Sequence, residues 1–305
     1  MKVLVTGGAG FIGSHIVDAY IGLGHQVCII DDLSTGRRSN INPRATLHLA
    51  DIRDAKLVKS IFEKERFNLV NHHAAQMDVR RSVADPAFDA SVNIIGLLNI
   101  LEAGLITGVR RVIFASSGGA IYGEQDVFPA GEDHPRRPIS PYGVAKLSSE
   151  QYLFYYKAVH GIDYVNLRYA NIYGPRQNPE GEAGVIAIFT TKMLKNEAAF
   201  VNGDGKQTRD YTFVGDVVKA NVLALDFHGS DSFNVGTGIE TNVNQLFQQL
   251  AKLTGTRIKE EHKEAKKGEQ LRSVLDASKA RRVLKWSPGV TLEEGLRQTV
   301  EFFRK

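Results

Sequence analysis

The feature that most constrains the fold is a glycine-rich turn near the start of the chain. It reads TGGAGFIG from Thr6 to Gly13, between an apolar run at 3–5 and a segment at 11–23 with helical apolar spacing. Glycines at this spacing tighten the turn and let the backbone approach a pyrophosphate, whose charge a helix N-terminus stabilises. The order of strand, turn and helix therefore predicts a dinucleotide site. The expected contacts in this turn are Gly7, Gly10, Phe11, Ile12 and Gly13.

An acidic pair, Asp31 and Asp32, ends the second predicted strand. A carboxylate at the first position accepts hydrogen bonds from the adenosine ribose hydroxyls, and the pair would repel a ribose 2′-phosphate. Arg37 and Arg38 could neutralise such a phosphate, but they are also typical of a solvated loop. We therefore expect NAD rather than NADP as the cofactor. The turn between the two pairs supplies three more expected cofactor contacts, Ser34, Thr35 and Gly36.

Length and composition suit a large α/β protein with a second, smaller lobe. The 305 residues are 43% hydrophobic, enough to bury a sizeable core. No apolar run approaches the roughly 18 residues needed to cross a bilayer, and the N-terminal residues lack the pattern of a signal peptide. Cys28 is the only cysteine, so no intrachain disulfide can form. We therefore expect a cytoplasmic protein without a membrane partner.

Charge and histidine spacing exclude two further classes of partner. The net charge of +4 is modest, and the chain has no arginine-rich or aromatic-interleaved basic run, so we expect no nucleic-acid partner. The adjacent pair His72 and His73 does not have metal-ligand spacing. We therefore assign no metal ligands.

Strand and helix signals alternate over the first 170 residues. The expected strands lie at 26–30, 46–49, 69–72, 111–115 and 163–167, and the expected helices at 55–64, 91–106 and 142–159. This alternation predicts an α/β fold with a doubly wound parallel sheet of the Rossmann type.

The rhythm breaks after Tyr169. A loop at 171–184, rich in Gly, Pro and Asn, is followed by a helix to 195 and then by short elements, and a capping box at 291–294 begins the last helix. We therefore expect a dinucleotide-binding domain at 1–170 with a return segment near 211–235. A smaller, discontinuous C-terminal substrate-binding lobe would consist of 171–210 and 236–305.

A tyrosine and a lysine four positions apart, Tyr142 and Lys146, share one face of the predicted helix. An ammonium near a phenol favours the phenolate, so we expect Lys146 to lower the pKa of Tyr142 from about 10. Tyr142 would then be a usable general base toward a sugar hydroxyl. The segment SSGGAIYG, 116–123, leaves the fifth strand at the edge where open α/β sheets bind ligands.

With these motifs in view, the chain resembles the extended short-chain dehydrogenase/reductase family, and within it the UDP-glucose (UDP-galactose) 4-epimerases. The resemblance covers essentially all 305 residues. Besides the motifs above it includes Asp51-Ile52, Ala74-Ala75-Gln76, Arg168 to Asn171, Thr208 to Tyr211 and DASKA at 276–280.

This resemblance implies further cofactor contacts. Asp51 and Ile52 would face the adenine, Ala74 and Ala75 would line the pyrophosphate, and Asn93 and Tyr169 would lie near the cofactor. The remaining expected contacts are Gln76, Ser116, Tyr142 and Lys146.

The same resemblance implies a site for a UDP sugar. Asn171 and Arg209 would bind its diphosphate, together with Lys266, where the family usually has arginine. A lysine keeps the charge but lacks the bidentate fork of arginine. Glu269 would bind the uridine ribose. The other substrate residues implied are Ser117, Gly118, Tyr142, Val185, Asn202 and Ser273.

One position departs from the family pattern. Relatives carry Ser or Thr four residues before Tyr122, where this chain has Gly118. We expect either Ser117 or a water beside Gly118 to supply the missing hydrogen bond to the reacting hydroxyl. Gly119 and Ala120 also lack the carboxyl group that dehydratases and decarboxylases of the family carry next. Reversible oxidation at one carbon, through a 4-keto sugar, is the simplest reaction left.

Substrate breadth and assembly leave alternatives open. The small Ser273 suits a 2-acetamido sugar as well as glucose, but a plain surface strand would also show a serine there. A 4-epimerase of another UDP sugar and a non-catalytic dinucleotide sensor are the two rival functions. The resemblance also implies a homodimer formed by the helices at 91–106 and 142–159, although core packing explains the same apolar residues.

Overall fold

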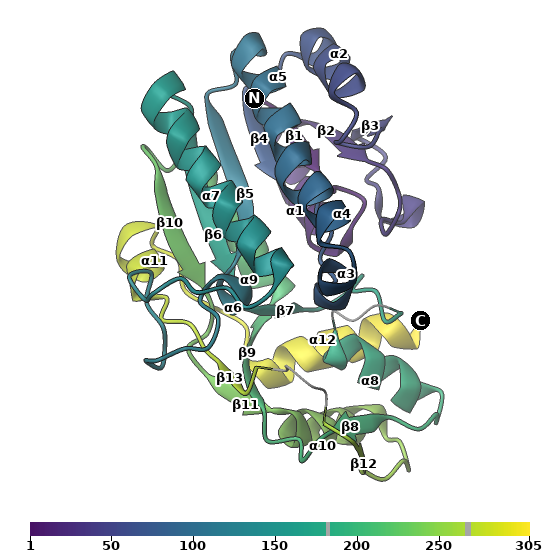
Figure 1. The fold of residues 1–305 in the computed structure, drawn as a ribbon. Helices are drawn as coiled ribbons and strands as arrows, with labels where there is room; N and C mark the ends of the chain where they lie inside the picture. The colour runs from purple at the N-terminus through teal and green to yellow at the C-terminus, as the bar shows by residue number, and fades with distance from the viewer. Residues whose placement is uncertain (181–183, 266–269) are drawn as a thin grey trace.

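The computed structural model describes residues 1–180, 184–265 and 270–305 (Figure 1). Seven parallel strands form its main sheet in the order β10-β6-β5-β4-β1-β2-β3. This arrangement confirms the predicted doubly wound fold. The strands are β1 (Lys2–Thr6), β2 (Gln26–Asp31), β3 (Thr46–Leu49), β4 (Leu69–His72), β5 (Arg111–Ser117), β6 (Asp163–Tyr169) and β10 (Asp231–Val235).

Helices cover both faces of this sheet because alternate side chains of each strand point to opposite faces. Val3 and Val5 of β1 pack in one apolar cluster with α1 (Phe11–Gly22) and α9 (Val214–Leu225). Leu4, between them, packs in a second cluster on the other face. The helices of that second cluster are α2 (Ala55–Glu65), α5 (Gly96–Thr107) and α7 (Pro141–His160).

A smaller lobe lies beyond the carboxyl ends of the main strands, in the lower half of Figure 1. Its four-stranded sheet consists of β7 (Asn171–Tyr173), β9 (Thr208–Phe213), β11 (Glu240–Asn242) and β13 (Arg272–Ser273). A separate pair joins β8 (Phe200–Asn202) and β12 (Glu261–Lys263). Three helices pack around one apolar cluster: α8 (Val185–Leu194), α10 (Val243–Thr254) and α12 (Leu292–Arg304). The chain returns to the main sheet through β10, as expected of a discontinuous lobe, while the domain boundaries given above remain predictions.

Three local predictions need correction. The expected loop at 171–184 begins with strand β7, because Asn171 to Tyr173 pair with β9. The expected helix at 91–106 starts earlier, as α4 (Pro86–Ala90), and passes through a π-helical turn, η2 (Ser91–Ile95). Only half of the predicted capping box forms, since Thr291 accepts from the Glu294 amide while the Glu294 carboxylate pairs with Arg297.

The continuous helical run 86–107 is long and apolar enough, by length and composition alone, to cross a membrane. The expectation that no apolar run approaches that length is therefore wrong. The run contains the buried polar residues Asp89 and Asn93, and its segments pack against α2 and α7. Such contacts are typical of a helix that packs on a sheet inside a folded protein.

The four remaining short helices complete the chain. They are η1 (Arg38–Asn40), α3 (Val79–Ala84), α6 (Gly118–Ile121) and α11 (Ser278–Val283).

Candidate active site at the carboxyl edge of the main sheet

The glycine turn between β1 and α1 is closed so tightly that side chains do not fit. Gly7 has a φ of +68°, and a Cβ atom there would lie 2.7 Å from the Ala74 nitrogen. A Cβ on Gly13 would lie 2.2 Å from the Gly7 carbonyl oxygen. Gly10 precedes α1 and offers no side chain to cap it, so the first amides of this helix are left for an anion. The turn therefore fits a pyrophosphate.

Asp31 is fixed beside this turn at the end of β2. Its carboxylate accepts from the amides of Ala9 at 2.9 Å and Leu33 at 2.8 Å. Burial raises the pKa of Asp31, although these two donors act against the increase. Each carboxylate oxygen keeps a further acceptor position for a ribose hydroxyl. A Cβ on Gly36 would lie 2.7 Å from Asp31 Oδ1, so this glycine keeps the approach to the carboxylate open.

The loop that follows Asp31, and carries Asp32 and the basic pair, is mostly exposed. Asp32 accepts from the amide and hydroxyl of Ser34, while Arg37 donates to the Asn178 side chain across the two lobes. Thr35 and Arg38 are exposed in the same loop. The side chain of Arg37 is therefore engaged away from the acidic pair, an arrangement compatible with the unphosphorylated ribose of NAD.

The expected adenine residues follow β3. Asp51 pairs with Arg53, whose hydrogen bond lowers the Asp51 pKa. Ile52 is buried against Gly96 at the start of α5, where a Cβ would lie 2.5 Å from the Ile52 side chain. Asn99 of α5 donates to the Ile52 carbonyl. These contacts fix the backbone of this segment, while its contact with adenine remains a prediction.

A buried polar network holds the segment 74–76 after β4. Thr6 Oγ1 accepts from the amide of Ala74, while Asn93 accepts from the amide of Gln76 and donates back to its carbonyl. Ala75 lies between these anchors. Asp89 was missed by the sequence analysis, although it accepts from both Gln76 and Asn93. Its position four residues before Asn93 on a helix is the signal that could have found it.

Helix α7 positions Tyr142 and Lys146. Pro141 lies in its first turn and the Ser140 side chain accepts from the Gly143 amide, so the helix begins one residue before the tyrosine. Lys146 is buried, and its Nζ donates to the Ala115 carbonyl of β5 at 2.8 Å. The same nitrogen lies 5.7 Å from the centre of the Tyr142 ring. The predicted pair is therefore brought together at the end of β5.

In the protein without cofactor, the pKa of Tyr142 does not fall toward neutrality as expected, and the decrease expected from a bound nicotinamide stays a prediction. Burial raises the pKa of Tyr142 to about 12, the charge of Asp89 acts in the same direction, and a hydrogen bond with Ser117 lowers it. Burial lowers the pKa of Lys146 itself to about 8. Desolvation outweighs the attraction between the two groups because both lie in the protein interior.

Ser117 is hydrogen-bonded to Tyr142, while its expected bond to the reacting hydroxyl stays a prediction. Ser117 precedes the short helix α6, and its side chain makes no capping hydrogen bond to that helix. The hydroxyl is therefore available to Tyr142. Ser116, the preceding residue, faces the opposite side of β5 and donates to Glu150 at 2.6 Å. The Ser116 hydroxyl is therefore engaged inside the protein, and the expected contact of this residue with the cofactor stays a prediction.

The space beside Gly118 is filled by an apolar side chain. A Cβ on Gly118 would lie 2.5 Å from Leu275 Cδ1, and Leu275 is fully buried. A Ser or Thr at this position would meet that leucine. The expectation of a water held beside Gly118 is therefore wrong, and Ser117 is left as the candidate donor.

Strand register brings part of the predicted substrate site together. Ser273 of β13 is paired with Arg209 of β9, and Asn171 of β7 is paired with Tyr211 of the same strand. A Cβ on Gly119 would lie 3.8 Å from Ser273 Oγ and 3.9 Å from Asn171 Oδ1. The end of β5 therefore meets the small sheet where the sugar residues were expected.

Two other predicted substrate residues lie elsewhere in the smaller lobe, and two lie outside the described residues. Val185 begins α8 and Asn202 ends β8, both in the smaller lobe. Lys266 and Glu269 lie outside the described residues. Arg209 donates to the Thr208 carbonyl at 2.8 Å and makes further contacts. Tyr169 is buried, and its hydroxyl accepts from Asn221 and lies 3.1 Å from His73 Nε2.

Comparison with known proteins identifies the family. The model of the NAD dependent epimerase/dehydratase family matches residues 3–236. The chain belongs to this family. The resemblance to extended short-chain dehydrogenases is thereby confirmed, and NAD is the cofactor of the family.

Three solved structures show how far the likeness extends. A UDP-glucose 4-epimerase from Thermotoga maritima, solved with UDP-glucose, is 50% identical with a TM-score of 0.98, covering 100% of this chain and 99% of that one. A UDP-glucose 4-epimerase from Thermus thermophilus in complex with NAD is 43% identical with a TM-score of 0.94, again covering 100% and 99%. A UDP-N-acetylglucosamine 4-epimerase from Methanobrevibacter ruminantium is 36% identical with a TM-score of 0.93, covering 99% and 97%.

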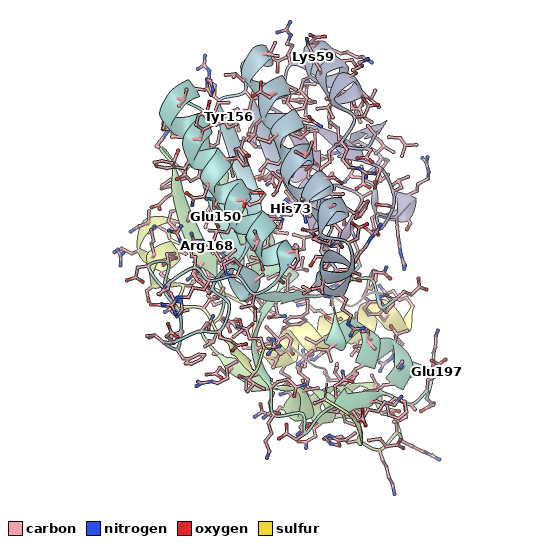
Figure 2. The ribbon with its side chains drawn as sticks, viewed as in Figure 1. Lys59, His73, Glu150, Tyr156, Arg168 and Glu197 are labelled. Carbon is pink, nitrogen blue, oxygen red and sulfur yellow. The ribbon has the colours of Figure 1, made fainter. Side chains whose placement is uncertain are left out.

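Two further polar residues form a buried network next to this site. Glu150 of α7 and Arg168 of β6 form a fully buried, two-pronged ion pair with distances of 3.0 and 2.7 Å, visible behind α7 in Figure 2. Glu150 also accepts from Ser116, and Arg168 donates to Tyr122. Glu150 lies one helical turn after Lys146, which is the spacing that could have revealed it.

Asp210 has the corresponding role in the smaller lobe. Its buried carboxylate accepts from the amides of Thr237 at 2.8 Å and Gly238 at 3.0 Å and from the Leu275 amide at 3.4 Å. It follows Arg209 directly and thereby ties the β9 strand to the loop after β10 and to the segment after Ser273. Sequence analysis singled out only its neighbour, because partners 27 and 65 residues away leave no local pattern.

Proposed function

We propose that the chain is an isomerase that interconverts the C4 epimers of a UDP-hexose, UDP-glucose and UDP-galactose, through a transient 4-keto sugar. The observation that carries this proposal is the meeting of Tyr142, Ser117 and Lys146 at the carboxyl edge of the sheet, beside a turn that fits a pyrophosphate. Its likeness to UDP-glucose 4-epimerases over the full chain supports the same reaction. Gly119 and Ala120 supply no carboxyl group for a competing elimination.

The residues that would hold NAD are those whose geometry fits it. The amides at the start of α1 face the pyrophosphate, Asp31 accepts from the adenosine ribose, and Lys146 orients the nicotinamide ribose. When bound, NAD supplies a reversible acceptor for the C4 hydride and a positive ring that favours the phenolate. Because no net oxidation occurs, the cofactor would stay with the protein through each turnover.

Tyr142 would remove the proton of the sugar 4-hydroxyl and return it to the epimer. Ser117 donates to the same oxygen and holds it near the phenol. Lys146 contributes a positive charge only 5.7 Å from the Tyr142 ring, but its own pKa of about 8 weakens that contribution in mildly basic solution. The sugar would turn about its bond to the diphosphate while Asn171 and Arg209 hold the nucleotide.

Substrate breadth is set by the volume near Ser273. This side chain is 3% exposed, and its hydroxyl is close to the open face of Gly119. A 2-acetamido group would fit better beside serine than beside a bulky residue. Turnover of UDP-galactose and UDP-N-acetylgalactosamine by the native enzyme and by Ser273→Tyr tests this point: loss of the N-acetylated activity alone supports breadth, and equal losses contradict it.

We further propose a cytoplasmic homodimer. Several large apolar side chains stay exposed on α5 and α7, among them Ile106, Phe154 and Val159. Two copies of these helices would bury them in a four-helix interface. Light scattering on the purified protein distinguishes a dimer of about 67 kDa, twice the 33.6 kDa chain, from a monomer.

The direct test of the activity uses the purified protein without added cofactor. Denaturation should release NAD, and native protein should convert UDP-galactose to UDP-glucose. Conversion of only UDP-glucuronate or a UDP-pentose would favour the rival substrate class. Bound dinucleotide without conversion of any nucleotide sugar would favour a sensor.

A further inference from the structure

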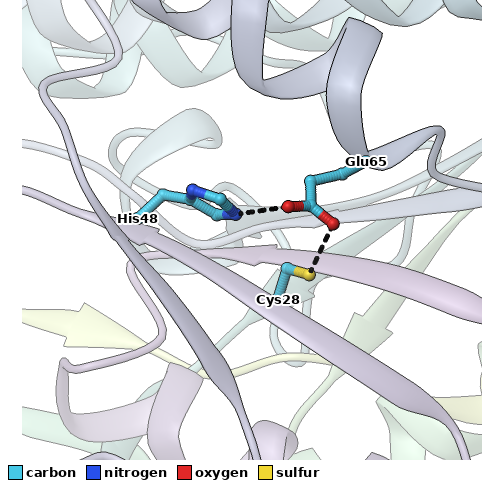
Figure 3. Close-up of side chains that lie close together, drawn as sticks. All are labelled: Cys28, His48 and Glu65. Atoms are coloured by element: carbon cyan, nitrogen blue, oxygen red, sulfur yellow. Dashed lines mark hydrogen bonds and ion pairs between the residues drawn. The ribbon is translucent and has the colours of Figure 1, made fainter.

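A second polar cluster lies on the far side of the nucleotide-binding domain from the active site. Cys28 of β2, His48 of β3 and Glu65 at the end of α2 point their polar atoms toward one another (Figure 3). The adjoining pocket is lined by Lys2, His25 and Gln26, at the amino ends of β1 and β2. The active site lies at the carboxyl ends of these strands, so the two sites are separated by the length of the sheet.

One polar atom from each of the three residues lies within 4.8 Å of the other two, close to the spacing that a small cation requires. His48 Nε2 lies 3.3 Å from Glu65 Oε1, Cys28 Sγ lies 3.9 Å from Glu65 Oε2, and all three groups fall within 4.8 Å of one another. Ligands around a tetrahedral zinc ion, with metal distances of about 2.0–2.3 Å, are themselves roughly 3.4–3.6 Å apart. Only small shifts of the Cys28 side chain would therefore be needed.

The environment of His48 is a second observation that indicates a missing binding partner. His48 Nε2 is buried and makes no hydrogen bond to any residue that the structure describes, although a carboxylate oxygen faces it at 3.3 Å. A protonated His48 would form an ion pair with Glu65, whereas a neutral His48 leaves Nε2 without a partner. A metal ion would satisfy both groups at once.

Lys2 is the group that would compete with a metal. Its ammonium pairs with Glu65. The Lys2 side chain is 29% exposed, whereas the Glu65 side chain is 12% exposed. Glu65 also ends α2, where the helix dipole disfavours a negative charge, so the carboxylate needs a cation. The Lys2 ammonium meets this need at Oε2, to which the Cys28 thiol also donates, and leaves Oε1 facing His48.

We propose that Cys28, His48 and Glu65 form a binding site for a borderline-soft divalent cation of the Zn²⁺ class. A sulfur, a nitrogen and an oxygen donor with a water in the fourth position is a zinc ligand set. On binding, the Cys28 thiol loses its proton to solvent and its sulfur forms a bond to the metal, without any change of oxidation state. The ion would join β2, β3 and the end of α2, and so stabilise the edge of the main sheet.

Spacing along the chain could not reveal this site. The ligands are 20 and 17 residues apart, and none of them belongs to a CxxC or HxxxH pattern. Parallel strand pairing brings Cys28 opposite Thr46, two residues before His48, and α2 then returns Glu65 to the same end. The absence of metal ligands expected from the sequence is therefore open to correction by experiment.

The test uses untagged, purified protein titrated with Co²⁺ and then with Zn²⁺. Because Cys28 is the only cysteine, a sulfur-to-cobalt charge-transfer band can arise only from this site. We expect the band to form in stoichiometric amount and to disappear when Zn²⁺ displaces Co²⁺. Zn²⁺ should also raise the melting temperature of the native protein.

Variants distinguish a built site from adventitious binding. Cys28→Ser should abolish the band, and His48→Gln should weaken binding at least tenfold, a typical cost of losing metal-site contacts. Lys2→Gln should tighten binding about threefold or more, because a competing charge is removed. The control is His262→Gln, which alters an exposed histidine paired with Glu260 far from any thiol and should change nothing.

Two results would overturn the proposal. One is a native protein with no charge-transfer band and no change in melting temperature. The other is Zn²⁺ binding that persists in Cys28→Ser and falls in His262→Gln, which would show an adventitious ion only. Neither result bears on the proposed epimerase, because the experiment contains no sugar and the cluster lies away from the catalytic residues.

Discussion

The two halves of the proposed active site are built in different ways. The cofactor half is built around one glycine turn, in which Gly7 contacts Gly10 and Gly13. The Asp31 carboxylate accepts from the amides of Leu33 and of Ala9 in that turn. The sugar half is assembled from three strands of the small sheet, which carry Asn171, Arg209 and Ser273. A local motif therefore specifies the first half, whereas the second depends on long-range register.

This difference predicts how substitutions in each half should affect the enzyme. In the cofactor half, replacing a glycine of the turn by alanine would place a methyl group against backbone atoms. We therefore expect cofactor binding to be lost. In the sugar half the strands are tied by one buried carboxylate, Asp210, so a change there should loosen substrate binding and spare the chemistry. Tyr142 and Ser117 lie between the halves and should affect turnover alone.

The largest effect is expected from Tyr142→Phe. Removing the phenolic oxygen eliminates the proposed acid and base, which should slow turnover by about 10³-fold. NAD should still be released from the denatured variant, since the glycine turn is unchanged. A variant that keeps most of its activity with cofactor bound would contradict the role of Tyr142.

Gly13→Ala should remove most of the bound NAD. Its new Cβ would lie 2.2 Å from the Gly7 carbonyl, and backbone at this distance must shift. Gly22→Ala is the matched control on the same helix, because a Cβ there meets nothing within 4 Å. Nucleotide content after denaturation measures both variants, and equal content in the two would show that the turn tolerates a side chain.

Ser117→Ala should lower kcat at least about tenfold, the smaller end of the effect of a lost catalytic hydrogen bond. Ser116→Ala is its control, since that hydroxyl bonds to Glu150 inside the protein. We expect Ser116→Ala to reduce stability and to leave kcat nearly unchanged. Similar kcat values for native protein and Ser117→Ala would leave Tyr142 as the sole group at the reacting oxygen.

Asp210→Asn should raise the KM for UDP-galactose several-fold with little change in kcat. An amide replaces one carboxylate oxygen with a donor that faces other donors, at a cost of about 1–3 kcal/mol in stability. Asp204→Asn, on an exposed turn, should leave the KM unchanged. If kcat falls while KM stays constant, the sugar half does not depend on Asp210 as described.

The smallest expected effect is a pH dependence of stability from Lys146. Its folded pKa of about 8 lies below the unfolded value of 10.5, so the unfolded chain binds more protons between these values and stability rises with pH. The gain is about 1 kcal/mol between pH 7 and 9. Denaturant unfolding of nucleotide-free protein should show it, and Lys146→Met should lack it; equal slopes for both proteins would contradict the pKa assignment.

The same contrast explains what could be predicted from the sequence. The main sheet, the glycine turn and the Tyr142–Lys146 pair follow from local periodicity and short motifs, and the structure places each as expected. Asp89 and Glu150 lie four residues from Asn93 and Lys146, a spacing that could have revealed them, whereas the partners of Asp210 lie 27 and 65 residues away. The pKa of Tyr142 in the cofactor-free protein lies above its usual value because burial is a property of the folded protein and cannot be seen in four-residue spacing. Leu275 beside Gly118 was hidden for the same reason, since 157 residues separate the two.

The central claim is that hydrogen leaves C4 of the sugar and returns to the same carbon on its other face. UDP-galactose labelled with deuterium at C4, incubated with purified protein and no added cofactor, tests it by mass spectrometry of the UDP-glucose formed. The account predicts that the product keeps the deuterium. Product that has exchanged its C4 label for solvent hydrogen would contradict it.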